Sequence, residues 1–312
     1  MKKVLITDDV HPDLIHKFEN ISYKVDYYPE ISLEEVKSII HDYEGLIVNS
    51  KILVDKDFID RAHSLKFIGR LGSGMEIIDQ TYAKQKGIGV FSSPEGNRNA
   101  VAEHAMAMLL ALGNNIIKAD QEVRKFIWNR QENRGFELEG KTIGIIGFGH
   151  TGRTFAQKLQ GWNVNILVYD KYLTGFSDHS FNVYESSKET VLEKSNIISL
   201  HLPLTEETFH YVDHEMLNKM KRRSVLINTS RGKIVDTLAL IEVLKSGHLK
   251  GACLDVFENE KPENYNTQEK KVYEELLKLK NIIVTPHIAG WTLESKEKLS
   301  KILFEKILLF LS

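Results

Sequence analysis

Three observations predict that this chain is an α/β protein with two doubly wound parallel sheets. Short runs rich in Val, Ile and Leu alternate with helical patterns along nearly the whole sequence. These runs are apolar on both faces, as strands of a parallel sheet covered by helices must be. The chain has 312 residues, more than one hydrophobic core usually supports, so two domains are expected.

The predicted strands fall into two groups. The first group is 4–7, 23–27, 46–49, 67–70 and 89–91, and the second is 142–146, 165–169, 197–200, 225–228, 252–256 and 282–285. Helical patterns cover 12–19, 33–41, 56–62, 98–112, 153–159 and 293–311. Repeated β-α units of this kind are typical of an open, doubly wound sheet.

A dense turn signal at 92–97 marks the predicted end of the first domain. One terminal helix cannot form a domain alone, so we expect 293–311 to return to the first domain. This organisation gives one domain from 1–96 and 291–312, and a second from 97–290.

Composition excludes several classes of protein. Lys plus Arg is 41 and Asp plus Glu is 43, so no basic excess favours a nucleic acid or membrane partner. The longest wholly apolar run, 105–112, is too short to span a bilayer, and Asp8 and Asp9 soon after the start are unlike a signal peptide. The single cysteine, Cys253, excludes an internal disulfide and a Cys-rich metal site. We therefore expect a cytoplasmic protein without a metal.

A G-x-G-x-x-G pattern at Gly147, Gly149 and Gly152 follows one predicted strand and opens a helix. Such glycines allow a tight turn and close approach to a pyrophosphate, which the helix N-terminus then faces. Asp170 ends the next strand, where an acid bonds the adenosine ribose and repels a 2′-phosphate. The pattern predicts a site for NAD rather than NADP, although the neighbouring Lys171 could blunt that preference. The alternative is a plain glycine turn with a solvated acid.

Polar residues follow directly after three later strands, at the same edge of the predicted sheet. Arg231 follows 225–228, Glu258 and Glu260 follow 252–256, and His287 follows 282–285. Each signal alone is weak, because an Arg in this place is more often an ion-pair partner and a single His more often structural. In a chain that also carries a dinucleotide motif, these three residue positions together indicate an anion-binding residue and an acid/base pair.

From about residue 46 onward the chain is similar to the D-isomer-specific 2-hydroxyacid dehydrogenase family, which includes D-3-phosphoglycerate dehydrogenase. The matching segments are GRLGSG at 69–74, NAVAEH at 99–104, GFGHTG at 147–152, HLPLT at 201–205, NTSRG at 228–232, LDVF at 254–257 with Glu260, and PHIAG at 286–290. The resemblance implies a flavodoxin-like substrate domain, a Rossmann-like NAD-binding domain and a homodimer.

The resemblance assigns the catalytic roles to Arg231, Glu260 and His287. Arg231 would hold the substrate carboxylate, His287 would exchange the hydroxyl proton, and Glu260 would orient the imidazole. The implied NAD contacts are Gly147, Gly149, His150, Thr151, Gly152, Asp170, Thr229, Ser230, Arg231, Asp255, His287, Ala289 and Gly290. The implied substrate contacts are Ser50, Lys51, Gly72, Ser73, Gly74 and Arg231. For His104 and His201 a packing or indirect role is at least as well supported as a direct contact.

The sequence does not determine which substrate the protein uses. Phosphoglycerate enzymes often carry an Arg-Ser pair where this chain has Asn49 and Ser50, although Lys51, Arg70 or Arg98 could compensate. Because the sequence ends at Ser312, we expect a form without a regulatory domain. The expected activity is NAD-dependent interconversion of a small D-2-hydroxyacid and its 2-keto acid. Phosphoglycerate, and with it serine biosynthesis, competes with glyoxylate or hydroxypyruvate reduction, and a non-catalytic NAD-sensing corepressor is the alternative from another class.

Overall fold

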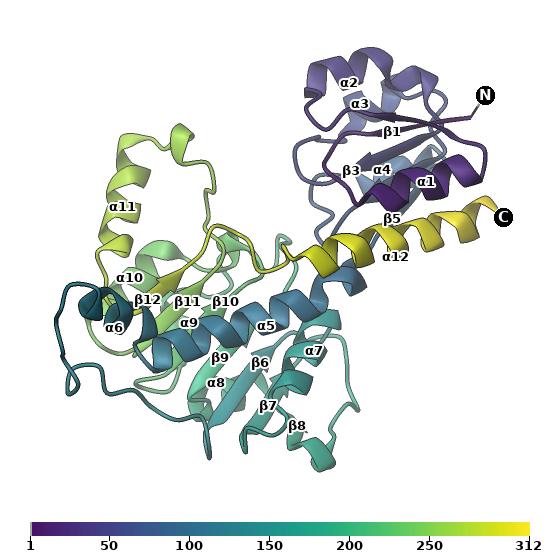
Figure 1. Ribbon diagram of the computed structural model, residues 1–312. Coiled ribbons are helices and arrows are strands. Elements are labelled where there is room, and N and C mark those ends of the chain that lie inside the picture. Colours follow the sequence, from purple (N-terminus) through teal and green to yellow (C-terminus); the bar gives the residue numbers. More distant parts are fainter. Residues whose placement is uncertain (1) are drawn as a thin grey trace. The chain divides into compact units, whose positions relative to one another are not determined.

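The computed structural model describes residues 2–312 and divides into two compact units (Figure 1). Unit 1 is formed by residues up to Arg98 together with Trp291–Ser312, and unit 2 is Asn99–Gly290. Each unit contains one sheet whose strands all pair in parallel. The predicted fold class is therefore confirmed.

Unit 1 has a five-stranded sheet in the order β2-β1-β3-β4-β5, which is the flavodoxin-like order. The strands are β1 (Lys3–Ile6), β2 (Lys24–Tyr27), β3 (Gly45–Val48), β4 (Phe67–Arg70) and β5 (Gly89–Ser92). The helices α2 (Leu33–Ile39), α3 (Lys56–Arg61) and α4 (Gln80–Gln85) supply buried side chains to one core cluster. The helices α1 (Pro12–Asn20) and α12 (Leu293–Leu311) supply a second.

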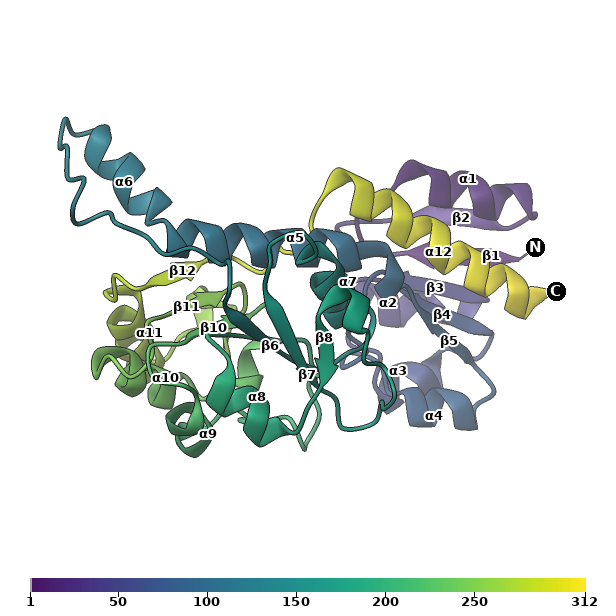
Figure 2. The ribbon, with the colours of Figure 1, turned by 90° about the horizontal axis from the view of Figure 1, so that it is seen from below.

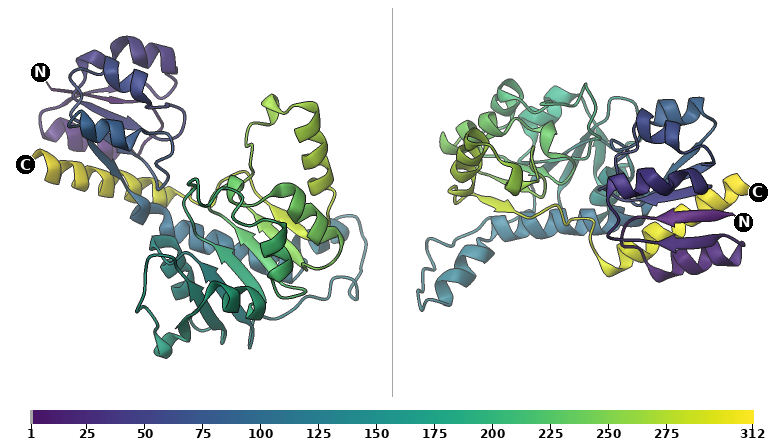
Figure 3. Two further views of the ribbon diagram at one scale, coloured as in Figure 1. Left: turned by 180° about the vertical axis from the view of Figure 1, so that it is seen from behind. Right: turned by 90° about the horizontal axis from the view of Figure 1, so that it is seen from above.

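The last helix of the chain is an integral part of unit 1. Leu303 and Ile307 are fully buried, and the ring of Phe304 meets that of Phe18 edge-on at 5.2 Å. Lys306 Nζ also donates to Glu95 at 2.8 Å. Figure 3 shows α12 running beside α1. The apolar side chains of α12 thus pack into the same core cluster as those of β1.

Unit 2 has a seven-stranded sheet in the order β12-β11-β10-β9-β6-β7-β8. The strands are β6 (Thr142–Ile146), β7 (Asn165–Tyr169), β8 (Val183–Glu185), β9 (Ile197–Leu200), β10 (Val225–Asn228), β11 (Gly251–Leu254) and β12 (Ile282–Val284). The order from β8 to β11 is that of a Rossmann-like sheet, to which β12 adds an edge. Its direction of winding reverses between β6 and β9, and ligands of open α/β sheets bind at such points.

Helices cover both faces of the sheet of unit 2. On one face lie α8 (Lys188–Lys194), α9 (His214–Lys219), α10 (Thr237–Lys245) and α11 (Thr267–Leu277). On the other lie α5 (Pro94–Gly113) and α7 (His150–Lys158). The remaining helix, α6 (Ile116–Val123), projects away from the sheet (Figure 2).

The helix pair α5 and α6 is the one feature of residues 2–312 that meets the length and hydropathy of a membrane span. No single helix in this range does so, and the pair is bent by 59° at its junction. Side chains of α5 are buried in a core cluster of unit 2.

Candidate active site

The glycine motif forms a tight turn at the carboxyl end of β6. Gly147 has a φ of +93°, and a Cβ on it would lie 2.2 Å from the carbonyl oxygen of His201. A Cβ on Gly152 would lie 2.1 Å from the carbonyl oxygen of Gly147. Larger residues at these positions would displace backbone, so the loop shape requires glycine.

The helix that follows begins at His150, three residues earlier than predicted. Gly149 is its N-cap and has no side chain, so no side-chain oxygen occupies the first N–H groups of α7. His150 and Gly149 are exposed, whereas Gly152 is buried against the loop. An uncapped helix N-terminus behind a glycine loop is suited to a pyrophosphate, and this observation fits the predicted dinucleotide.

Asp170 follows β7 and faces the glycine loop. Its Oδ2 accepts a hydrogen bond from the Phe148 amide at 2.7 Å, and its Oδ1 accepts from the amides of Tyr172 and Leu173, both at 2.9 Å. Burial by itself raises the pKa of Asp170, but these three hydrogen bonds and the charge of Arg153 outweigh burial and lower it. The carboxylate is therefore ionised, as the predicted contact with ribose hydroxyls requires.

Three neighbouring strands position the predicted catalytic residues, because β10, β11 and β12 are adjacent and parallel. His287 Nδ1 lies 2.8 Å from Glu260 Oε2, and the two side chains are 44% and 39% exposed. The structure thus brings together the predicted imidazole and its predicted carboxylate. The pair is only half-buried, so it is partly accessible to water.

Arg231 is held by the turn after β10. The Asn228 side chain donates from Nδ2 to the Arg231 carbonyl oxygen at 3.0 Å and accepts from the Ser230 amide at 3.0 Å. Ser230 Oγ donates to the carbonyl oxygen of Leu200 at 2.5 Å, which ties this turn to β9. Arg231 Nη1 donates to the Ser230 carbonyl oxygen at 2.6 Å. The sequence did not indicate that Asn228 organises this turn.

Asp255 forms hydrogen bonds with the segment that carries His287. The side chain is fully buried, and Oδ1 accepts from Thr285 Oγ1 at 2.6 Å and from the Ile288 amide at 2.9 Å. Oδ2 accepts from the Ala289 amide at 2.8 Å. These bonds hold His287 at a φ of +56°, a conformation that non-glycine residues rarely adopt. Asp255 therefore fixes the backbone that presents the imidazole.

His104 joins this network from α5. Its Nε2 lies 3.0 Å from Thr285 Oγ1 and 3.6 Å from Asp255 Oδ1. Among residues 2–312, no group of three or more His, Cys, Asp or Glu side chains could hold a metal ion.

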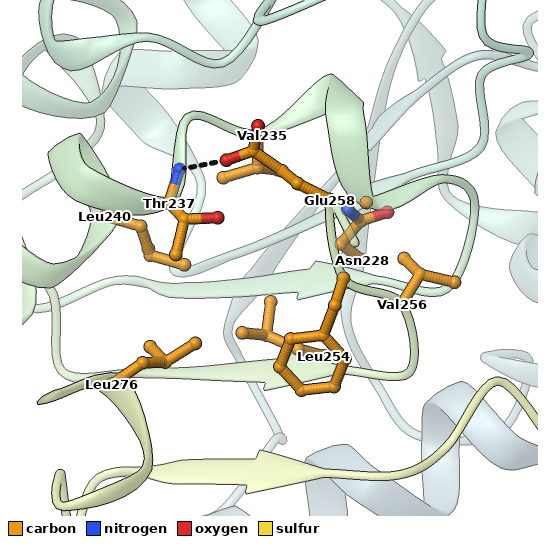
Figure 4. Close-up of a pocket in the computed structure, with 10 residues that line it drawn as sticks. Asn228, Val235, Thr237, Leu240, Leu254, Val256, Glu258 and Leu276 are labelled. Atoms are coloured by element: carbon orange, nitrogen blue, oxygen red, sulfur yellow. Dashed lines mark hydrogen bonds between the residues drawn. The ribbon is translucent and has the colours of Figure 1, made fainter. Parts of the chain in front are cut away.

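The turn after β10 and the loop after β11 meet beside a small cavity that both of them line (Figure 4). Glu258 lies at this junction, with Oε1 accepting from the Thr237 amide at 3.0 Å and Oε2 lying 2.7 Å from His210 Nε2. Gly232 packs so closely that a Cβ on it would lie 1.9 Å from the carbonyl carbon and oxygen of Phe257. Of the two candidate acids, Glu258 thus braces the loops while Glu260 contacts His287.

His201 lies behind the glycine loop at the end of β9. Its Nε2 is 2.9 Å from Ser199 Oγ, and its ring lies 5.3 Å from that of Phe155. Although the residue as a whole retains some exposure, burial of the ring lowers the pKa of His201 to about 3. The imidazole is therefore neutral in the folded protein, which agrees with a packing role.

Acidification is expected to destabilise the protein through His201. Between pH 6.5 and 3 the unfolded chain binds a proton at this position that the folded chain does not, so stability is full above pH 6.5 and falls below it. The loss reaches up to about 2 kcal/mol at pH 5. In urea denaturation at pH 7 and pH 5, His201→Gln should lose less stability than the wild type.

The matched control is His16→Gln, which removes an exposed imidazole from α1 and should behave like the wild type. Equal losses for His201→Gln and wild type would show that His201 does not resist protonation.

The predicted substrate residues belong to unit 1 and follow β3 and β4, which are neighbours in its sheet. Gly72 has a φ of +135°, and a Cβ on it would collide with Arg70 Nη1. Gly74 is buried, whereas Ser50, Lys51 and Ser73 are exposed. Lys51 Nζ donates to the Pro29 carbonyl oxygen.

Comparisons with known proteins identify the class to which this fold and this glycine loop belong. Residues 106–289 match the model of the D-isomer specific 2-hydroxyacid dehydrogenase NAD binding domain. The chain is 34% identical to a glyoxylate reductase of Pyrococcus furiosus over 99% of its own length and 92% of that protein. The chain therefore belongs to the D-isomer specific 2-hydroxyacid dehydrogenase family, and the resemblance seen in the sequence is confirmed.

Other similar proteins are named for different substrates. A D-3-phosphoglycerate dehydrogenase of Archaeoglobus fulgidus is 36% identical over 98% of this chain, but the chain spans only 56% of that protein's length. A D-lactate dehydrogenase from Aquifex aeolicus, solved as a complex with NAD and lactic acid, has a TM-score of 0.87 and 29% identity, with 99% of this chain and 95% of that one covered.

Proposed function

We propose that the protein is an NAD-dependent oxidoreductase that interconverts a small D-2-hydroxyacid and its 2-keto acid. The observation that carries this proposal is the contact of 2.8 Å between His287 Nδ1 and Glu260 Oε2, in the same unit as an uncapped glycine loop. A binding module would need the loop but not the imidazole–carboxylate pair.

We propose the following placement for the cofactor. Gly147, Gly149, His150, Thr151 and Gly152 would meet the pyrophosphate, and Asp170 the adenosine ribose. The nicotinamide side would be lined by Thr229, Ser230, Arg231, Asp255, His287, Ala289 and Gly290. When bound, NAD supplies the acceptor for the hydride that leaves C2 of the hydroxyacid.

The side chains of the protein have three proposed roles in this reaction. Arg231 holds the substrate carboxylate through charge-assisted hydrogen bonds, and so fixes which face of C2 is presented. His287 accepts the proton of the hydroxyl group during oxidation and returns it during reduction. Glu260 holds Nδ1–H of His287, so that Nε2 is the nitrogen that exchanges the proton.

Unit 1 would supply the remaining contacts to the substrate. We propose that Gly72, Ser73 and Gly74 offer backbone amides to the carboxylate, and that Ser50 and Lys51 contact the far end of the molecule. A phosphorylated substrate such as 3-phosphoglycerate would need a cation there. Lys51 is exposed, and its Nζ donates to the backbone carbonyl of Pro29.

A panel of 2-keto acids tests the activity and the substrate together. Oxidation of NADH is followed with glyoxylate, hydroxypyruvate, pyruvate and 3-phosphohydroxypyruvate, and reduction of NAD with 3-phosphoglycerate. Turnover of any of these supports the dehydrogenase, and the ranking of kcat/KM identifies the substrate class. Tight binding of NADH without turnover of any compound would contradict the proposal and favour a corepressor-like sensor.

We also propose that two copies of the chain associate through the segment around α6. Phe126 and Trp128, which follow α6, are 98% and 76% exposed, and Ile116 and Ile117 on α6 are half-exposed. Several exposed apolar side chains in one segment are typical of a surface that a partner covers. Sedimentation velocity should give twice the chain mass of 35.8 kDa, and Phe126→Ser with Trp128→Ser should give the monomer. A monomeric wild type would contradict the proposal.

The location is proposed from one residue. Cys253 is buried and unpaired, as expected in a reducing compartment such as the cytoplasm.

A further inference from the structure

Two loops flank the glycine loop in unit 2, because β7 and β9 are the strands on either side of β6. Lys171 belongs to the loop after β7, next to Asp170, and Glu207 belongs to the turn after β9. Lys171 Nζ donates a hydrogen bond to Glu207 Oε2. This ion pair therefore joins the two loops beside the proposed ribose contact.

Both ends of the pair stand on ordered turns. On one side, Asp170 Oδ1 accepts from the amides of Tyr172 and Leu173 at 2.9 Å, which fixes the backbone around Lys171. On the other, Thr208 Oγ1 accepts from the Thr205 amide at 2.8 Å and donates to the Pro203 carbonyl oxygen at 2.7 Å. The backbone on either side of Glu207 is thus held by its own turn, independently of Lys171.

The lysine ammonium has a second anchor in Tyr172. It lies 5.3 Å from the centre of the Tyr172 ring, and Tyr172 OH donates to Glu207 Oε2 at 3.3 Å. The hydrogen bond and charge of Glu207 raise the pKa of Lys171, and those of Lys171 lower the pKa of Glu207. The cation whose charge lowers the pKa of Asp170 is Arg153. Lys171 is therefore paired with Glu207.

This arrangement has a consequence for the choice of nucleotide. A free lysine next to the ribose contact would attract the 2′-phosphate of NADP, which carries up to about two negative charges at neutral pH. With its ammonium bound to Glu207, Lys171 attracts such a phosphate less, because the negative charge of Glu207 offsets that of the lysine. We propose that Glu207 is a specificity-determining residue, which favours NAD over NADP by engaging Lys171. The inference rests on the proposed function, in which Asp170 contacts the ribose.

The experiment measures the dissociation constants of NADH and NADPH on the full chain by fluorescence titration. Glu207→Ala should tighten NADPH relative to NADH by about fivefold, as expected for the loss of one exposed charge pair. The double variant Glu207→Ala with Lys171→Met should return the ratio toward that of the wild type. Raising the salt concentration should shrink the gain, since the charges are exposed.

A matched control is Glu275→Ala, which breaks the ion pair of Glu275 with Lys245 elsewhere on unit 2, where exposure is similar. Its nucleotide ratio should equal that of the wild type. An unchanged ratio in Glu207→Ala would overturn the inference, and so would a gain that persists in the double variant. If the wild type bound neither nucleotide, the proposed function would fail as well. If NADH bound and turned over while Glu207→Ala changed nothing, only the present inference would fail.

Discussion

His287→Ala is expected to lower kcat by about 100- to 10,000-fold, the usual contribution of a positioned acid/base group. We propose that the His287 imidazole exchanges the transferred proton. The contact of 2.8 Å between Glu260 Oε2 and His287 Nδ1 fixes the orientation of the ring. The measurement is steady-state reduction of the best 2-keto acid of the panel. Binding of NADH should change little, because the glycine loop and Asp170 stay intact.

The control for this variant is His214→Ala. His214 is an exposed imidazole at the start of α9, with 63% of its side chain exposed, and its loss should leave kcat unchanged. A His287→Ala enzyme with a kcat near that of the wild type would remove His287 from the proton transfer. A large fall in kcat for both variants would indicate a general effect of losing surface imidazoles.

Gly232→Ala is expected to lower kcat/KM by about 100-fold or more, although it removes no functional group. The added methyl would lie 1.9 Å from the carbonyl carbon and oxygen of Phe257 and 2.5 Å from the Glu258 amide nitrogen. Because the obstacle is backbone, the Arg231 turn or the Glu260 loop must move. Displacement of a reacting group by about 1 Å can cost about that factor.

Stability is measured alongside activity, because overpacking of this kind costs about 1–3 kcal/mol. Gly113→Ala is the control, since the nearest atoms to its added methyl belong to the flexible Phe136 side chain at 3.3 Å. Folded Gly232→Ala protein with wild-type kcat/KM would show that Arg231 and Glu260 do not depend on each other's loops.

Most strands could be predicted from their short apolar runs, although the predicted bounds of some, such as β3 and β11, are shifted by one or two residues. The ranges of β4, β6, β7, β9 and β10 agree with the prediction to the residue. β8 was missed, because its three residues follow the polar stretch around Asn182 and only Val183 is buried. The predicted start of α5 at residue 98 was wrong, since Pro94 begins the helix inside the turn signal, where its missing N–H is not needed.

The candidate site could be predicted only in part. The strand ends predicted Arg231 and His287 as candidate residues, but the spacing alone left Glu258 and Glu260 equivalent. The backbone of the loop decides between them, because it turns Glu258 toward His210 and Glu260 toward His287. The contact of Lys171 with Glu207 joins residues from two separate loops, and no local pattern in the sequence indicates it.

The place of α12 in unit 1 sets the order in which the chain can fold during synthesis. A ribosome delivers residues 2–98 first, yet Leu303, Phe304 and Ile307 complete the cluster around Phe18 and Phe67. The folding of this first segment is therefore incomplete, with part of its apolar surface exposed, until the last residues of the chain have been synthesised. The central segment Asn99–Gly290 has its own sheet and both covering layers, so it can form first. Truncation before Leu293 should accordingly yield an aggregating product rather than a shorter folded one.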